Sequence, residues 1–177
     1  MRSKTVWLML VLGLVVSRPA GAEQTDRLTF GLRASVASHD KKENFNQYEA
    51  FANLELPWSW QLGGGWNLVP KLELTAGVLK GGGESGFVTS LGPSLTLRGL
   101  EDRLALDVGV SPTFLSRRRF GEQSFGEYIQ FTSHASINFE VVRNLHVGYR
   151  FQHMSNASIS DINPGLDLHM FELSYRF

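Results

Sequence analysis

The sequence predicts an all-β protein, an eight-stranded antiparallel transmembrane β-barrel, and three observations favour it. The first is a series of segments in which apolar and polar residues alternate with a period of two, as in a strand with two unlike faces. The second is an apolar N-terminal stretch typical of an exported protein. The third is the presence of Trp and Tyr near segment ends and of an aromatic last residue, Phe177, which are typical of outer-membrane barrels.

The first 22 residues have the features of a secretory signal peptide. Arg2 and Lys4 precede the apolar run VWLMLVLGLVV, and a triplet of small residues ends at Ala22. We expect cleavage after Ala22, so that residues 23–177 form a single barrel domain. The apolar run is too short for a spanning helix, which needs roughly 20 apolar residues.

The net charge, the cysteine content and the spacing of possible metal ligands each exclude one class of partner or of stabilising bond. Removal of residues 1–22 leaves 14 basic residues against 17 acidic ones, a net charge of about −3, which argues against nucleic acid. The chain has no cysteine, so no disulfide framework supports it. Neither zinc-ligand spacing nor an EF-hand pattern occurs, and we therefore expect no metal and no cofactor.

The eight alternating segments supply the strands of the predicted barrel. In the first, Leu28, Phe30 and Leu32 alternate with polar or small residues; in the sixth, Phe125 shares the apolar parity and Tyr128 the polar parity. The segments cover about 27–36, 47–60, 67–78, 86–98, 104–114, 125–142, 145–155 and 167–177.

Alternation alone does not say which parity faces inward. The export signal, the even number of segments and the aromatic residues at their ends favour an apolar side that faces lipid. Closure of the barrel leaves no unpaired strand edge in the hydrocarbon. A secreted barrel resembling lipocalins, with its apolar side inward, is the alternative.

Both termini of such a barrel are expected in the periplasm. Short turns near 99–102 and 142–144 then face the periplasm. The longer loops, near 39–46, 80–85, 117–124 and 156–165, face the cell exterior. The first three of these loops carry basic residues that are either solvated loop charges or contacts for lipid phosphates, namely Lys41, Lys42, Lys80, Arg117, Arg118 and Arg119.

Polar residues take over the lipid-facing parity near the end of the seventh segment. His153 and Ser155 continue the line of Tyr149 and Phe151. If the last residue pairs near position 143, the hairpin keeps a constant index sum near 320, and Asp167 lies opposite His153, with Cβ atoms roughly 4.5–5.5 Å apart. Polar groups facing hydrocarbon are costly. Either the residues lie in the wet headgroup region, or Ser155, His153 and Asp167 act as nucleophile, base and orienting acid.

The same residues resemble a known family. His153-Met154-Ser155-Asn156, the turn Asn163-Pro164-Gly165 and the acid Asp167 are similar to the C-terminal motif of outer-membrane lipid A 3-O-deacylases (PagL), which are eight-stranded barrels. The family acid is commonly glutamate, so Asp167 departs from the pattern by one methylene.

The resemblance implies a serine esterase of the Gram-negative outer membrane. Its substrate would be lipopolysaccharide in the outer leaflet, from which it removes the ester-linked acyl chain at position 3 of lipid A. The implied catalytic residues are His153, Ser155 and Asp167. We expect the Asn156 side chain and backbone N–H groups next to it, including that of Ala157, to bind the oxyanion or substrate.

Two other functions are left open by the sequence. Outer-membrane phospholipase A is similar in its His-x-Ser-Asn stretch, but that family has a larger barrel, an asparagine as third member and calcium. A structural or adhesive small barrel with no activity is the other alternative. Homodimer formation is also left open, because every strand offers a similar lipid-facing side; His169, on that side, is an expected neighbour of the site.

Overall fold

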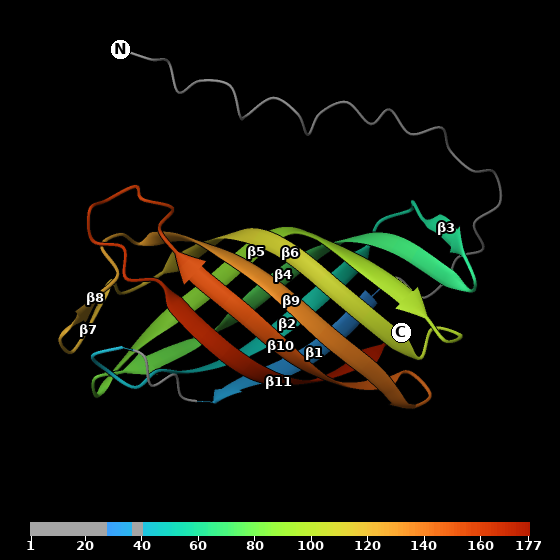
Figure 1. Ribbon diagram of the computed structural model, residues 1–177. Helices are drawn as coiled ribbons and strands as arrows, with labels where there is room; N and C mark the ends of the chain where they lie inside the picture. The colour runs from blue at the N-terminus through green and yellow to red at the C-terminus, as the bar shows by residue number, and fades with distance from the viewer. Residues whose placement is uncertain (1–27, 37–40) are drawn as a thin grey trace, which may run out of the picture.

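Eight long antiparallel strands form a closed barrel in the computed structural model (Figure 1). The structure describes residues 28–36 and 41–177, and the predicted signal peptide lies outside them. The barrel strands are β1 (Leu28–Val36), β2 (Asn46–Glu55), β4 (Trp66–Gly81), β5 (Glu84–Gly99), β6 (Leu104–Leu115), β9 (Ile129–Val142), β10 (Leu145–Ser155) and β11 (Leu166–Arg176). Each pairs with its neighbour along the chain, and β1 pairs with β11 to close the barrel.

Three short strands lie outside the barrel wall. β3 (Trp60–Gly63) folds back on the start of β4, and β7 (Arg119–Phe120) pairs with β8 (Gln123–Ser124) between β6 and β9. We call the end of the barrel with residues 41–45, 116–128 and 156–165 the loop end; the opposite end, with the turn at 143–144 and the C-terminus, is the turn end (Figure 1). None of the described residues forms a helix that is long and apolar enough to span a membrane.

Two predicted segments are too long. The second ends at Glu55, not at Trp60, since Pro57 has no N–H for a ladder hydrogen bond, and Trp60 belongs to β3. The sixth begins at Ile129, so the predicted outward position of Phe125 is wrong: its side chain is 1% exposed. Tyr128, predicted to face inward, is also wrong, because it is 46% exposed.

The connection near 80–85 is shorter than predicted. Strand β4 ends at Gly81 and β5 begins at Glu84, so only Gly82 and Gly83 lie between them. Both have positive φ, +53° and +74°, as the two central residues of a type I′ hairpin turn require. A tight hairpin therefore replaces the expected loop.

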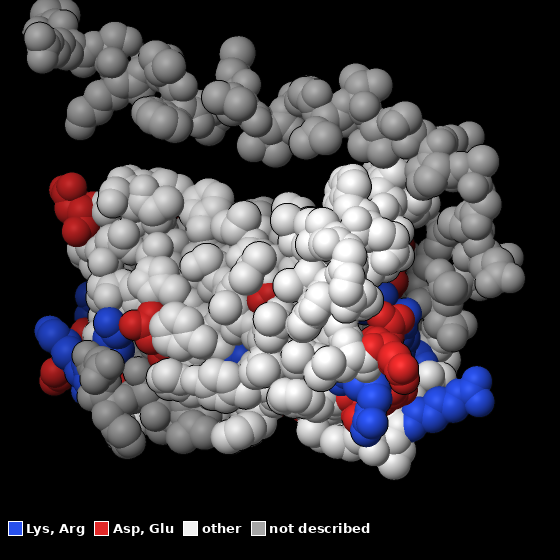
Figure 2. Space-filling view, turned by 45° about the vertical axis from the view of Figure 1, so that its right-hand side comes forward, with Lys and Arg blue, Asp and Glu red and all other residues white. Residues whose placement is uncertain are grey.

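The outer wall of the barrel is apolar, as predicted. Leu32 on β1 and Phe171 on β11 are 65% and 61% exposed, and the other strands present leucine, valine, isoleucine and phenylalanine in the same way. On the face shown in Figure 2, the charged side chains that reach the surface gather mostly at the two ends, and the band between them is almost uncharged. Such a band matches the lipid-facing surface of a transmembrane barrel.

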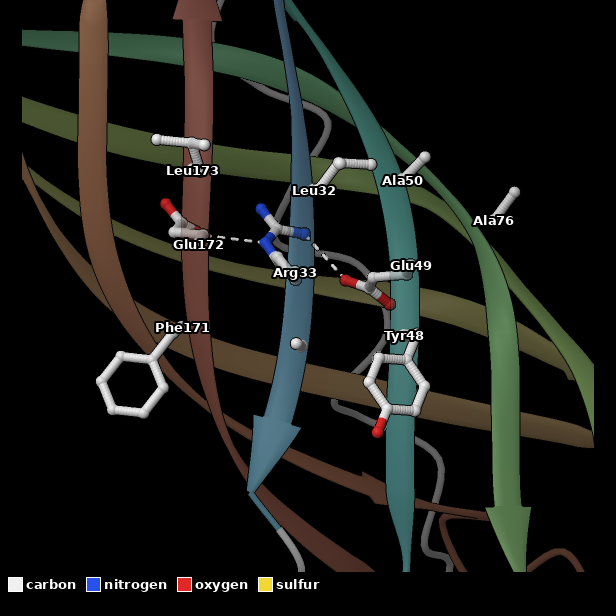
Figure 3. A pocket seen from close by; sticks show the side chains of 10 residues that line it. Leu32, Arg33, Tyr48, Glu49, Ala50, Ala76, Phe171, Glu172 and Leu173 are labelled. Carbon is white, nitrogen blue, oxygen red and sulfur yellow. Dashed lines mark hydrogen bonds and ion pairs between the residues drawn. The ribbon is translucent and has the colours of Figure 1, made fainter.

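The middle of the barrel interior is filled by charged side chains. The Arg33 guanidinium donates to Glu172 and Glu73 at 2.7 Å and to Glu49 at 3.0 Å. Figure 3 shows Arg33 of β1 between Glu172 of β11 and Glu49 of β2. Arg150 donates to Glu73 at 2.9 Å from the other side. Every one of these buried charges has an opposite partner, which offsets the cost of removing it from water.

The interior of the loop end holds a large apolar cluster instead of charged side chains. Phe45, Phe120 and Phe125 meet edge to face with centroids 5.4–6.0 Å apart. We call the buried cluster around them the apolar plug; it consists of Phe45, Leu79, Val88, Leu115, Phe120, Phe125, Met154, Leu166, Leu168 and Met170.

Candidate active site

The β10–β11 hairpin brings His153 and Asp167 together on the outer wall at the loop end. The two residues are direct partners in the strand register, at the predicted index sum of 320. Nδ1 of His153 lies 2.6 Å from Oδ1 of Asp167, so an N–H at Nδ1 donates to the carboxylate. The side chains are 46% and 42% exposed, and the pair is therefore open to the surrounding lipid or water.

The apolar plug anchors the strands that carry this pair. Because side chains alternate along a strand, Met154 points inward next to His153, and Leu166 and Leu168 point inward on either side of Asp167. All three are at most 1% exposed and belong to the plug. Their packing fixes the backbone from which the outward polar side chains project.

Ser155 is the last residue of β10 and shares the outward face with His153. Two residues of strand separate them, a rise of about 6.8 Å. Ser155 is half-buried and pairs with Phe131 of β9. Within the described part of the chain its hydroxyl has no hydrogen-bond partner, so the oxygen is available to a substrate.

Two further residues lie beside His153: Ser133, which was not predicted, and Gly165, which was predicted only as part of a turn. Ser133 of β9 pairs with His153 and is exposed on the same wall; it interrupts the apolar parity between Phe131 and Ala135, which is a signal the sequence did carry. Gly165 has φ +66°, and a Cβ on it would lie 2.9 Å from Cε1 of His153. The imidazole therefore packs directly against the Gly165 backbone.

Asn156 stabilises the loop between β10 and β11. It is fully buried, and its Nδ2 lies 2.7 Å from Ile162 O, 3.1 Å from Ser160 Oγ and 3.2 Å from Phe125 O. Its backbone N–H donates to Oδ1 of Asn163 at 3.0 Å. The expectation that the Asn156 side chain donates to an oxyanion is therefore corrected, because its amide hydrogens already have acceptors inside the protein.

The next two residues after Asn156 have an unusual backbone. Ala157 and Ser158 are left-handed, with φ +51° and +63°, a conformation that side chains disfavour. Both are exposed, and no acceptor for either backbone N–H is found among residues 28–36 and 41–177. These two donors lie directly after Ser155-Asn156 in the chain.

A second polar pair lies on the same wall, nearer the turn end than His153 and Asp167. The Tyr149 hydroxyl is 2.5 Å from Nδ1 of His169, and the Phe151 ring is 5.3 Å from the His169 ring. His169 faces outward, as predicted for a neighbour of the site, and pairs with Phe151 in the strand register.

The six basic residues of the first three loops all lie at the loop end, but their surroundings differ. Lys41 donates to Pro164 O at 2.9 Å, next to the glycine that touches His153. Arg117 pairs with Glu84 at 2.6 Å. The others either lie near an aromatic ring, as Lys80 and Arg118 do over Tyr48 and Tyr128, or are exposed without a partner among the described residues, as Lys42 and Arg119 are.

No group of three or more His, Cys, Asp or Glu residues in the described ranges is arranged to hold a metal ion. A hydroxyl, an imidazole and a carboxylate follow one another along β10 and β11 on the outer wall.

Comparison with known proteins identifies the family. A family model described as lipid A 3-O-deacylase (PagL) matches residues 46–176. A protein of Bordetella bronchiseptica named lipid A deacylase PagL is 30% identical over 131 residues, which cover 71% of this chain and 74% of that protein. The chain belongs to the lipid A 3-O-deacylase (PagL) family.

The architecture agrees with this family. The crystal structure of the outer membrane enzyme PagL superposes with a TM-score of 0.74 over 84% of this chain and 99% of that one, at 17% identity. A designed transmembrane β-barrel superposes with a TM-score of 0.52 over 88% and 98%, at 12% identity. The chain is an outer-membrane β-barrel of the PagL family, as predicted.

Proposed function

We propose that this PagL family member is a serine esterase that removes the ester-linked acyl chain at position 3 of lipid A in the outer leaflet. The observation that carries the proposal is the 2.6 Å contact between His153 and Asp167 on the outer wall, beside a free serine hydroxyl. Buried polar networks stabilise many barrels, whereas an exposed one on a lipid-facing wall needs another reason. Family membership supports lipid A as the substrate.

In the first step the Ser155 oxygen attacks the ester carbonyl carbon, and Nε2 of His153 accepts the hydroxyl proton. Asp167 accepts a hydrogen bond from Nδ1, so it fixes the tautomer with Nε2 unprotonated and stabilises the imidazolium that forms. When the tetrahedral intermediate collapses, the sugar oxygen leaves and takes the proton from His153. An acyl-serine is left behind.

In the second step a water molecule attacks the acyl-serine. His153 accepts a proton from this water and returns it to the Ser155 oxygen as the fatty acid leaves, so the enzyme is regenerated. The negative charge on the carbonyl oxygen needs donors in both steps. We assign the backbone N–H groups of Ala157 and Ser158 to this role, because they follow the nucleophile and lack acceptors within the described chain.

The exposed wall position suits a substrate that stays in the membrane. The acyl chain can remain among other lipid chains while its ester meets Ser155, so a deep pocket is unnecessary. We also propose that the basic residues of the loop end contact the phosphates of lipid A, with Lys42 and Arg119 best placed to do so because neither has a protein partner in the described ranges.

The test is mass spectrometry of lipid A from Gram-negative cells that express the wild-type chain or variants. We expect wild type to remove one acyl chain, Ser155→Ala to lower the rate by at least about 10³-fold, and Asp167→Asn to lower it by about 10²- to 10⁴-fold, since the amide no longer selects the correct tautomer. Asp161→Asn, an exposed change in the same loop, is the matched control and should have no effect.

Three other outcomes would contradict part or all of this proposal. Release of fatty acid from glycerophospholipid but not from lipid A would replace the proposal with a phospholipase. Unchanged lipid A in cells where the wild-type barrel is folded in the outer membrane would indicate a structural or adhesive role. Full activity of Ser155→Ala would contradict the assignment of Ser155 as the nucleophile.

A further inference from the structure

Ser133 lies on the outer wall, on the other side of His153 from Asp167. His153 of β10 pairs with Asp167 of β11 and with Ser133 of β9, so the three side chains form one row across neighbouring strands. Directly opposed residues on one face have Cβ atoms roughly 4.5–5.5 Å apart. Ser133 is exposed, and it takes no part in the chemical steps proposed above. Its hydroxyl is therefore an unused polar group next to the proposed base.

The barrel itself supplies no partner for the Ser133 hydroxyl. In the part of the chain that the structure describes, no hydrogen bond joins its Oγ to another residue. Its neighbours on the same face are Phe131 and Ala135 of β9 and, in the strand register, Val110 of β6. A hydroxyl among apolar side chains on a lipid-facing wall costs free energy when it lacks a partner. A partner that arrives with the substrate would offset this cost.

The orientation of the His153 ring directs Nε2 toward both serines. Nδ1 faces Asp167, so the Cδ2–Nε2 edge, on the opposite side of the ring, faces away from β11 and toward β9. A Cβ on Gly165 would lie 2.9 Å from Cε1 and 3.6 Å from Nε2, so these two atoms are also turned toward the loop end. Nε2 therefore points into the space that Ser133 borders from β9 and Ser155 borders from the loop end.

Two different oxygen atoms must occupy this space during the proposed reaction. In the first step the leaving sugar oxygen takes the proton from Nε2, and in the second step the attacking water gives a proton to Nε2. Because the second step is the chemical reverse of the first with water in place of the sugar, both oxygens lie on the same side of the acyl carbon. Ser133 and Ser155 are diagonal neighbours, roughly 7–8 Å apart, so an oxygen next to an acyl group on Ser155 comes within reach of Ser133.

We propose that the Ser133 hydroxyl positions the oxygen atom that exchanges a proton with His153. In the first step Ser133 donates a hydrogen bond to the sugar oxygen as the ester bond breaks. In the second step it accepts a hydrogen bond from the water molecule, whose other proton goes to Nε2. A hydroxyl suits both steps because it can donate and accept. This inference rests on the proposed function and adds a fourth side chain to its reaction.

The experiment separates the two steps with the purified full-length barrel in detergent micelles. One substrate is a glucosamine phosphate acylated at position 3, and the other is the nitrophenyl ester of the same acyl chain. Nitrophenolate leaves without a proton or a hydrogen-bond donor, so only the sugar ester needs Ser133 in the first step. The burst of nitrophenolate measures acylation and the steady state that follows measures deacylation, while single-turnover release of the sugar measures acylation by the sugar ester.

For Ser133→Ala we expect acylation by the sugar ester and deacylation each to slow about tenfold, the factor that one hydrogen bond provides. Acylation by the nitrophenyl ester should change by less than about twofold, because this step does not use the lost hydrogen bond. Ser133→Thr keeps a hydroxyl on a residue that suits a strand, and it should restore both rates to within about threefold of wild type.

Ser85→Ala is the matched control. Ser85 is also an exposed serine near the loop end, but it lies on β5, which β6 separates from β9. All three rates of this variant should equal those of wild type.

Equal slowing of acylation by both esters in Ser133→Ala would overturn the inference and assign Ser133 a structural role. Unchanged rates in Ser133→Ala, or rates in Ser133→Thr as low as those in Ser133→Ala, would overturn it as well. Hydrolysis of neither ester by wild type, under conditions where the barrel is folded, would instead contradict the proposed function itself.

Discussion

The middle and the loop end of the barrel have opposite polarity. In the middle, Arg33 and Arg150 point inward among glutamates, while Leu32 and Phe151 point to the lipid. At the loop end the interior holds the apolar plug and, among the described residues, no ionic network, and the polar side chains of His153, Ser155 and Asp167 face outward. The change occurs within a few residues of β10, between Arg150 inside and His153 outside.

This inversion shows that the alternation of a strand can persist while the roles of its faces are exchanged. The plug and the outward polar residues support one another, since the same strands supply Met154 to the plug and His153 and Ser155 to the wall. The ionic network instead stabilises the barrel without touching the site. Substitutions in the two regions should therefore separate folding from activity.

The largest effect on stability is expected in the ionic network. Glu73→Leu removes the carboxylate shared by Arg33 and Arg150, and the buried guanidinium groups lose a partner. Breaking a buried ion pair in this way costs about 3–5 kcal/mol. We expect a fall of that size in the free energy of unfolding by urea from phospholipid vesicles, with unchanged kcat for the fraction that remains folded.

Glu122→Leu serves as the control for this change, because Glu122 is exposed in the loop between β7 and β8. It should alter the free energy of unfolding by less than about 0.5 kcal/mol. If Glu73→Leu proved equally mild, the ionic network would not be the element that stabilises the middle of the barrel.

A smaller effect on stability, but a larger one on activity, is expected in the plug. Met154→Ala opens a cavity directly behind His153 and Ser155 and should cost about 2–3 kcal/mol. Loss of this support lets β10 shift, so kcat should fall about tenfold. Unfolding curves and single-turnover kinetics measure the two quantities.

Met170→Ala makes the same change elsewhere in the plug, on β11, three residues beyond Asp167. Its cost in stability should be similar and its effect on kcat less than about twofold. Equal kinetic effects of the two substitutions would mean that the plug does not position the site through β10.

The lipid-facing wall of the barrel and the His153–Asp167 pair could be predicted from sequence, because both follow from the two-residue period of the strands and from the register of their pairing. Alternation located the eight strands, and a constant index sum placed Asp167 opposite His153. The plug could not be predicted, because Phe45, Phe120 and Phe125 lie outside the barrel strands, where a period of two does not assign a face. The alternation around Phe125 even continued that of β9 by chance.

The loop after Ser155 was harder to predict for another reason. An asparagine amide donates equally well to a substrate or to its own loop, and only the fold shows that Phe125 O and Ile162 O accept its hydrogens. The partners of Arg33 come from three other strands, and no local pattern identifies them. For Asn156 and Arg33 the residue type predicted that the side chain donates hydrogen bonds, but it did not predict which residues accept them.

The smallest effect on stability, and a selective one on activity, is expected at Gly165. A Cβ in the left-handed conformation costs about 1 kcal/mol, and at this position it also lies 2.9 Å from Cε1 of His153. Ordinary contact begins at 3.4 Å, so in Gly165→Ala the imidazole must move by a few tenths of an ångström. Since a displacement of about 1 Å costs on the order of 100-fold, we expect kcat to fall about tenfold.

Gly83→Ala isolates the backbone cost, because Gly83 has φ +74° and a Cβ there meets no atom within 4 Å. Both variants should lose about 1 kcal/mol of unfolding free energy, and only Gly165→Ala should lose activity. If Gly165→Ala kept full kcat, the imidazole would have room to adjust, and the close packing of His153 on the loop would have no part in holding it toward Ser155. If Gly83→Ala lost activity as well, the tight β4–β5 hairpin would influence the site through the plug.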